Sequence, residues 1–149
     1  MSIESNNMIS CTKKIEFDAA HRIIDHHGAC KMLHGHRYVI EVTFSKFLKD
    51  FTNHDMVIDF IIIKQKLDSW IKQHWDHNTI LSEQDKDLGN SIEKCTSQTI
   101  FYLKKQPTAE NMAIFLMQEI IPVLFDEYGV KCTRLRLRET PSSFVEVLM

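Results

Sequence analysis

The sequence lacks the features that mark several large classes of protein. Its 149 residues contain only four glycines and three prolines, and no linker rich in these residues divides them. Because there is also no internal repeat, we expect one domain at residues 11–149, behind a polar tail at residues 1–10. Charges nearly cancel, with 18 Lys+Arg against 20 Asp+Glu, so no positive field exists to hold a nucleic acid backbone.

Long apolar runs and paired cysteines are also missing. The longest apolar stretch, Val57 to Ile63, is interrupted by Asp59 and falls far short of the roughly 20 residues that cross a membrane. The first ten residues have neither the basic start nor the apolar centre of a secretory signal. The four cysteines form no CxxC pair, which predicts free thiols in a reducing compartment. These absences predict a cytoplasmic protein that neither enters a membrane nor binds nucleic acid.

Apolar periodicity predicts strands at both ends of the chain and helices between them. Alternation predicts strands at residues 13–21, 36–44, 133–140 and 143–147, and helical spacing predicts helices at residues 60–75 and from Thr108 to about Pro122. The charged segment 79–106 shows only a possible short strand at residues 99–103. This order predicts an α+β fold, an antiparallel four-stranded sheet with two helices on one face. Its unpaired sheet edges predict a homo-oligomer.

Eight histidines are the compositional oddity, and five of them fall within 16 residues. His34 and His36 are two apart on a predicted strand and therefore point to the same face. If the first two strands pair as a hairpin, His21 lies opposite them. Three imidazoles with no fourth protein ligand are typical of a catalytic zinc that keeps one position open. A histidine satisfied by hydrogen bonds in the core is the alternative, and it fits a lone histidine better than three on one face.

The other histidines carry weaker signals. His26 and His27, beside Gly28, are expected to be exposed loop residues, and His54 and His74 to be structural or solvated.

Two further elements could supply proton-transfer groups. Cys30 stands four residues before His34, so a cation bound there would lower its thiol pKa; the alternative is a small buried apolar residue. Asp76 directly precedes His77, and an aspartate near a histidine can orient the ring and raise its basicity. Neighbouring residues seldom bond side chain to side chain, so this pair alone is a weak signal.

Glu139 is a carboxylate on an apolar face. It continues the inward alternation of Leu135 and Leu137, where an unpaired charge is costly. It therefore either pairs with an internal arginine or waits for a ligand that offers a fork of N–H groups, as a guanidine-like heterocycle does. A register shift of one residue would turn Arg138 and Thr140 inward instead.

Six segments taken together resemble the 6-pyruvoyl-tetrahydropterin synthase / 6-carboxytetrahydropterin synthase family. The similarity runs from about residue 13 to residue 147 in the family's order. The segments are FDAAHR (17–22), CKMLHGHRY (30–38), VIDF (57–60), WDHN (75–78), PTAEN (107–111) and RET (138–140).

The resemblance implies a tunnelling fold, in which sheets of several subunits close into a barrel, commonly trimers stacked into hexamers, with sites at subunit interfaces. It implies one zinc ion per subunit and a dyad supplied by a neighbouring subunit. By matching motifs, it assigns His21, His34 and His36 as zinc ligands, Cys30 as the proton-abstracting thiol, Asp76 and His77 as the dyad, Glu139 as the pterin anchor, and Thr108 and Glu110 as pocket-lining residues.

The resemblance also implies a zinc-dependent lyase acting on 7,8-dihydroneopterin triphosphate. The bacterial branch releases acetaldehyde and triphosphate and forms 6-carboxy-5,6,7,8-tetrahydropterin for queuosine and other deazapurines. The three residues between Cys30 and His34 resemble the shorter loop of that branch. The long charged segment 79–106 departs from its compact pattern. Two alternatives therefore stay open: a 6-pyruvoyl-tetrahydropterin synthase of the tetrahydrobiopterin pathway, which eliminates triphosphate alone, and a non-catalytic zinc- and pterin-binding relative.

Overall fold

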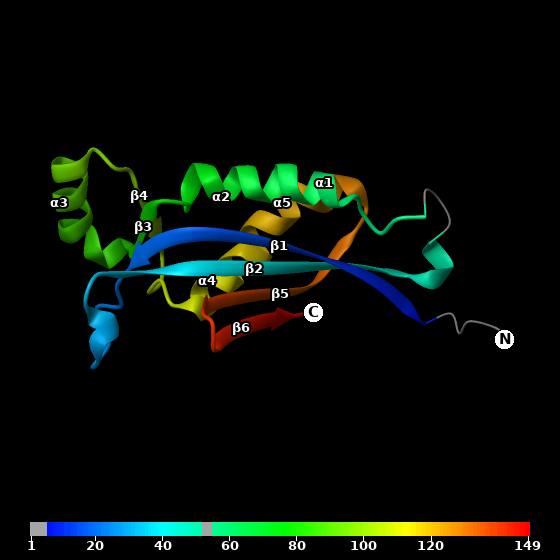
Figure 1. Ribbon diagram of the computed structural model, residues 1–149, viewed down its shortest axis with the longest axis horizontal. Coiled ribbons are helices and arrows are strands. Elements are labelled where there is room, and N and C mark those ends of the chain that lie inside the picture. The colour runs from blue at the N-terminus through cyan, green and yellow to red at the C-terminus, as the bar shows by residue number, and fades with distance from the viewer. Residues whose placement is uncertain (1–5, 52–54) are drawn as a thin grey trace.

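The computed structural model describes residues 6–51 and 55–149, which form an α+β fold built on one curled sheet (Figure 1). The six strands lie in the order β4-β3-β1-β2-β5-β6. Their bounds are β1 Met8–His21, β2 His34–Phe47, β3 Asn78–Ser82, β4 Ile100–Leu103, β5 Lys131–Thr140 and β6 Ser143–Leu148. Because β1 begins at Met8, residues 8–10 of the predicted tail belong to the sheet. His54 and residues 1–5 lie outside the described residues.

Strands β1 and β2 form the long antiparallel hairpin that the alternation predicts. They pair from Met8 opposite Phe47 to His21 opposite His34. Strand β5 pairs antiparallel with β2, and β6 with β5. The hairpin therefore brings two of the predicted ligands side by side where its strands meet the connecting loop.

The prediction of a four-stranded antiparallel sheet is wrong at the opposite edge, where two parallel strands are added. Strand β3 pairs in parallel with β1, and β4 in parallel with β3, so the six-stranded sheet is mixed. Parallel neighbours need a crossover connection, and helix α3 (Lys86–Thr96) supplies it between β3 and β4. The short strand predicted at residues 99–103 is confirmed as β4. Strand β3 escaped prediction because four of its five residues are buried, which removes the alternation.

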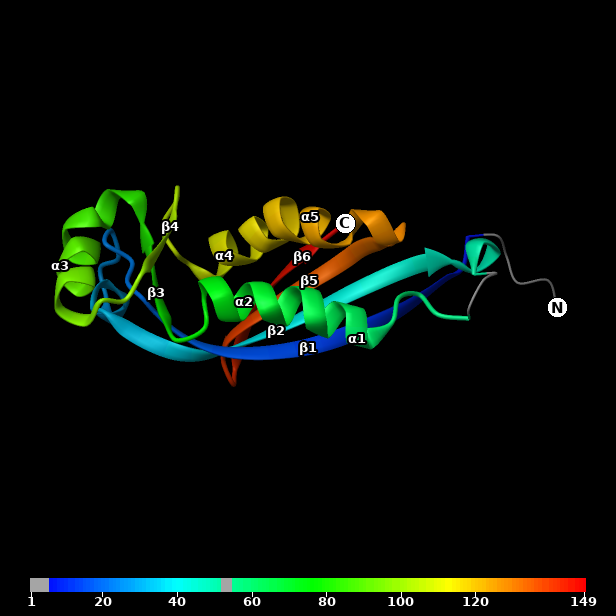
Figure 2. The same ribbon diagram turned by 90° about the horizontal axis from the view of Figure 1, so that it is seen from above.

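The two predicted helices cover one face of the sheet, and α3 stands at its end as a third helix (Figures 1 and 2). The first helix joins α1 (Phe60–Ile63) to α2 (Ser69–His74), and the second joins α4 (Ala109–Phe115) to α5 (Ile121–Phe125), each through a π-helical turn. The Asp59 and Thr108 side chains cap their first turns. Pro122 does not end the second helix, because it stands in the first turn of α5 after that π-helical turn.

The hydrophobic core fills the space between the helices and the sheet. Trp75, Tyr38 and Phe17 are among its largest fully buried side chains, and Phe17 stacks on Tyr38 with ring centroids 5.1 Å apart. None of the helices within residues 6–51 and 55–149 has the length and apolar character needed to cross a membrane. The core thus packs against the face of β1 and β2 that also carries the histidines.

Candidate functional site

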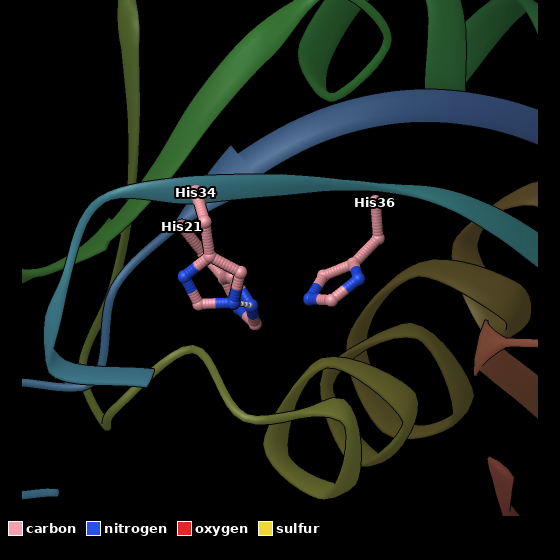
Figure 3. A group of neighbouring side chains, drawn as sticks. All are labelled: His21, His34 and His36. Atoms are coloured by element: carbon pink, nitrogen blue, oxygen red, sulfur yellow. Dashed lines mark hydrogen bonds between the residues drawn. The ribbon is translucent and has the colours of Figure 1, made fainter. Parts of the chain in front are cut away.

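Three histidines meet at the end of the β1–β2 hairpin. His21 is 2% exposed, and its Nε2 lies 3.2 Å from His34 Nε2. The His36 ring centroid lies 5.2 Å from that of His21 and 4.8 Å from that of His34. Figure 3 shows all three rings pointing away from the strands into one shared space. The predicted convergence of the three side chains is therefore observed within a single chain.

Backbone carbonyl groups fix which ring nitrogen faces the shared space. His21 Nδ1 lies 2.7 Å from the Pro107 carbonyl oxygen, and His34 Nδ1 lies 2.7 Å from that of Met32. Each Nδ1–H donates to its carbonyl, which leaves a lone pair on each Nε2. Two lone pairs 3.2 Å apart repel each other unless a cation lies between them. The three histidines, whose ligand atoms all lie within 4.8 Å of one another, could therefore hold a metal ion.

Burial favours the neutral, metal-binding form of two of these imidazoles, His21 and His36. Removal from water lowers the pKa of His21 more than the Pro107 carbonyl and the Glu139 carboxylate raise it. The same cause lowers the pKa of His36, again against the effect of Glu139. Because a neutral imidazole is the ligand and a protonated one is not, the site is prepared for a metal at neutral pH.

Tyr38 belongs to the cluster although the sequence suggests only a core residue. Its buried hydroxyl lies 3.2 Å from His21 Nδ1 and 3.3 Å from His21 Nε2. Burial raises the pKa of Tyr38, and Glu139 and the Cys30 sulfur raise it further. Cys30 is half-buried in the 3-10 turn Ala29–Lys31, just before β2. The available signal was the position of Tyr38, two residues after His36 on the same face.

The predicted pocket residues fall into three different environments. Glu139 Oε1 lies 3.3 Å from His21 Nε2 and 3.5 Å from His36 Nε2. Its partners are therefore histidines, and not the internal arginine that the sequence analysis named as one possibility. The Thr108 hydroxyl accepts a hydrogen bond from the Asn111 N–H, at the start of α4. Glu110 is exposed in the first turn of that helix. Of these, only Glu139 contacts the cluster.

Asp76 and His77 form a side-chain contact that sequence neighbours seldom make. Asp76 Oδ1 lies 3.0 Å from His77 Nδ1 and accepts a hydrogen bond from the Asp18 N–H at 3.0 Å. The contact exists because His77 adopts a left-handed backbone with φ 55°, and its N–H donates to the Asp18 carbonyl at 2.7 Å. The Gln98 side-chain amide donates to the His77 carbonyl at 2.6 Å. The strained turn is therefore held from both sides.

The electrostatic surroundings keep Asp76 ionised. Burial acts to raise the pKa of this carboxyl, but the Asp18 N–H and the His77 ring lower it by more, and the net shift is downward. The His77 side chain is 78% exposed. It lines an open hollow of about 500 Å³ together with Asp18, Ala20 and Arg37.

Most of this hollow lies on the opposite face of the sheet from the histidine cluster, although His36 also borders it. Along β1, Asp18 and Ala20 alternate with Ala19 and His21, so the two sets of side chains point to opposite faces. Within one chain, the structure brings the three histidines, Glu139 and Tyr38 together and leaves the Asp76–His77 dyad outside that group.

One ion pair near the cluster was missed by sequence reasoning. Arg22 follows His21, and its Nε and Nη2 donate to the two Asp85 oxygens, each at 2.5 Å. Asp85 is 5% exposed and lies in the segment 79–106 that resisted interpretation. The pair fastens that segment to the end of β1.

Fold and site together define an α+β protein with a curled sheet and a histidine cluster that could hold a metal. Residues 10–148 match the family model described as 6-pyruvoyl tetrahydropterin synthase. The chain belongs to this family, which confirms the resemblance.

Individual relatives agree with the family match. The 6-carboxy-5,6,7,8-tetrahydropterin synthase of Rickettsia conorii is 49% identical over 140 residues, which cover 94% of this chain and all of that protein. An uncharacterized protein from Wolinella succinogenes superimposes with a TM-score of 0.80 at 18% identity, over 96% of this chain and 99% of that one. The 6-pyruvoyl tetrahydropterin synthase of Caenorhabditis elegans superimposes with a TM-score of 0.67 at 21% identity, over 99% of both chains. The homologues imply an enzyme.

Proposed function

We propose that this protein is a zinc-dependent 6-carboxy-5,6,7,8-tetrahydropterin synthase that acts in the cytoplasm, in the biosynthesis of queuosine. Its substrate is 7,8-dihydroneopterin triphosphate, and its products include acetaldehyde and triphosphate. The observation that carries the proposal is the convergence of three imidazoles, His21, His34 and His36, around one space. The relative from Rickettsia conorii supports the choice of product, because it bears this activity in its name at 49% identity.

The three histidines would hold the zinc ion, with the Pro107 and Met32 carbonyls fixing two of the rings. Bound zinc supplies a Lewis acid that polarises an oxygen of the substrate side chain. The residues around it perform the binding and the proton transfers. Glu139 would bind the ring N–H groups of the pterin as a carboxylate fork, beside Thr108 and Glu110.

Proton transfer is assigned to Cys30 and the dyad. The Cys30 thiolate would remove a proton from the side chain of the substrate, and the His77 ring, oriented by Asp76, would deliver or accept a proton at the other end of the transfer. Since the dyad lies on the face opposite the histidines, we propose that it serves the site of a neighbouring subunit in a trimer or hexamer.

Product identification tests the proposal directly. Zinc-loaded protein is incubated with 7,8-dihydroneopterin triphosphate, the pterins are identified by mass spectrometry, and acetaldehyde is assayed in parallel. We expect 6-carboxytetrahydropterin together with acetaldehyde, and none of either from Cys30→Ala. 6-Pyruvoyl-tetrahydropterin without acetaldehyde would place the protein in the other branch of its family. Binding without turnover would indicate a non-catalytic relative.

A further inference from the structure

Glu139 stands at an irregular point of the sheet. The pairing of β5 with β6 shifts between Arg138 and Thr140, which leaves Glu139 as the extra residue of a bulge. Bulges re-aim a side chain and are common beside active sites. The side chain of Glu139 is 28% exposed, and its ion pairs within the described residues are with His21 and His36.

These contacts join groups that do not attract each other by themselves. The Nδ1–H of His21 is donated to the Pro107 carbonyl, so His21 Nε2 offers a lone pair. Glu139 Oε1, 3.3 Å away, also offers lone pairs, and so does His34 Nε2 at 3.2 Å. Acceptors that crowd together in this way are stabilised by a cation at the point they share.

Three of the separations are those of a four-coordinate metal site, although Glu139 is not in the group of ligand atoms that all lie within 4.8 Å of one another. In a tetrahedral zinc centre with bonds of about 2.0 to 2.1 Å, neighbouring ligand atoms lie roughly 3.3 to 3.4 Å apart. The observed distances are 3.2 Å for His21–His34, 3.3 Å for His21–Glu139 and 3.5 Å for His36–Glu139. We infer that Glu139 Oε1 is the fourth metal ligand of the pterin-free protein, and that it leaves the metal when the carboxylate binds the N–H groups of the pterin ring.

This inference rests on the proposed function, from which it takes the three-histidine centre and the pterin-binding role of Glu139. A carboxylate that grips two ring N–H groups uses both of its oxygens, so it cannot stay on the metal at the same time. Arrival of the pterin therefore opens the position on the metal that the substrate side chain needs. By linkage, a pterin ring that does not itself touch the metal weakens metal binding, and the metal weakens binding of that ring to the same extent.

Cobalt(II) substitution tests the first half of the inference without any turnover. The visible absorption bands of Co²⁺ move when one of its ligands is exchanged for another. We expect the spectrum of Glu139→Gln to differ in band position from that of the wild type, because water takes the place of the carboxylate, and we expect Co²⁺ affinity to be reduced by roughly 10- to 100-fold. Glu146→Gln is the matched control, because Glu146 pairs with Arg136 and does not contact the histidines. It should bind Co²⁺ like the wild type.

Unsubstituted pterin tests the second half, since it carries no side-chain hydroxyl that could bind the metal. Added to Co²⁺-loaded wild type, it should shift the spectrum toward that of Glu139→Gln, and it should leave the variant unchanged. The inference would be overturned if wild type and Glu139→Gln had equal spectra and equal Co²⁺ affinities, or if pterin left the wild-type spectrum unchanged. Failure of the wild type to bind Co²⁺ at all would refute the three-histidine centre itself, and the inference with it.

Discussion

Two clusters of titratable groups flank the same end of β1, and they are built in opposite ways. On the helix-facing side, His21 is almost fully buried, and backbone carbonyl groups hold the rings of His21 and His34. On the outward side, His77 is 78% exposed in a strained turn fastened by Asp18 and Gln98. The buried cluster could hold a cation, whereas the exposed dyad is open to proton exchange at the surface. One strand thus serves two sites.

The largest expected effect comes from breaking the buried cluster. His34→Ala should reduce the bound metal from one ion per chain to almost none, because two histidines hold zinc far more weakly than three. Product formation should fall by about a thousandfold or more. Elemental analysis of the purified protein and a product assay measure the two effects. His27→Ala, which removes an exposed histidine of the nearby loop, should change neither quantity.

Breaking the exposed dyad should separate rate from metal content. His77→Ala is expected to reduce turnover by about 100- to 10,000-fold, since a positioned acid or base is worth that much. The metal content should stay at one ion per chain, because His77 is not one of the three histidines that could hold the metal. Loss of metal from this variant would show that the two clusters are not independent.

Mixing the two inactive variants tests whether each site contains residues from two subunits. His34→Ala and His77→Ala are unfolded together and refolded as mixed oligomers. If the dyad serves a neighbour, about a quarter of the sites receive both intact parts, and activity should return to roughly that fraction. Mixed oligomers that stay as inactive as the separate variants would mean that both parts must come from one chain.

The Arg22–Asp85 pair should affect stability more than it affects either cluster. Asp85→Ala leaves the Arg22 guanidinium without its partner, which should lower the free energy of unfolding by about 2 to 4 kcal/mol. Urea denaturation measures the change. Glu83→Ala, an exposed carboxylate in the same turn, is the control and should change it by less than about 0.5 kcal/mol.

The smallest expected effect is the pH dependence that Asp76 contributes. Its pKa is lower in the folded protein than the ordinary value of 3.8, so its charge stabilises the fold above that value. This contribution is lost as the pH falls below about 4, through the folded pKa. Asp76→Asn should therefore be less stable than the wild type at pH 6, by less than about 1 kcal/mol, and the difference should vanish in acid. A difference independent of pH would contradict the charge-based explanation.

The sequence predicted the parts of the molecule that depend on strict alternation. The β1–β2 hairpin and the shared face of His21, His34 and His36 follow from a period of two residues. The inward direction of Glu139 follows from the same rule, but its contact with the histidines does not, because a bulge sets the final aim of the side chain.

The parts that failed depend on long-range contacts. Strand β3 is too short and too buried to show a pattern, and its parallel pairing with β1 joins residues far apart in the sequence, such as Ala19 and Asn78. The Asp76–His77 contact depends on a left-handed residue that Gln98 and Asp18 hold in place. The Arg22–Asp85 pair joins residues 63 positions apart. No local pattern in the sequence encodes these contacts.

A zinc titration tests the central claim most directly. Metal-free protein is given increasing amounts of Zn²⁺, and 6-carboxytetrahydropterin formed from 7,8-dihydroneopterin triphosphate is measured by mass spectrometry at each step. The account predicts that product formation rises in proportion to zinc and stops rising at one ion per chain. Equal product formation by metal-free protein, or no 6-carboxytetrahydropterin at any zinc level, would contradict it.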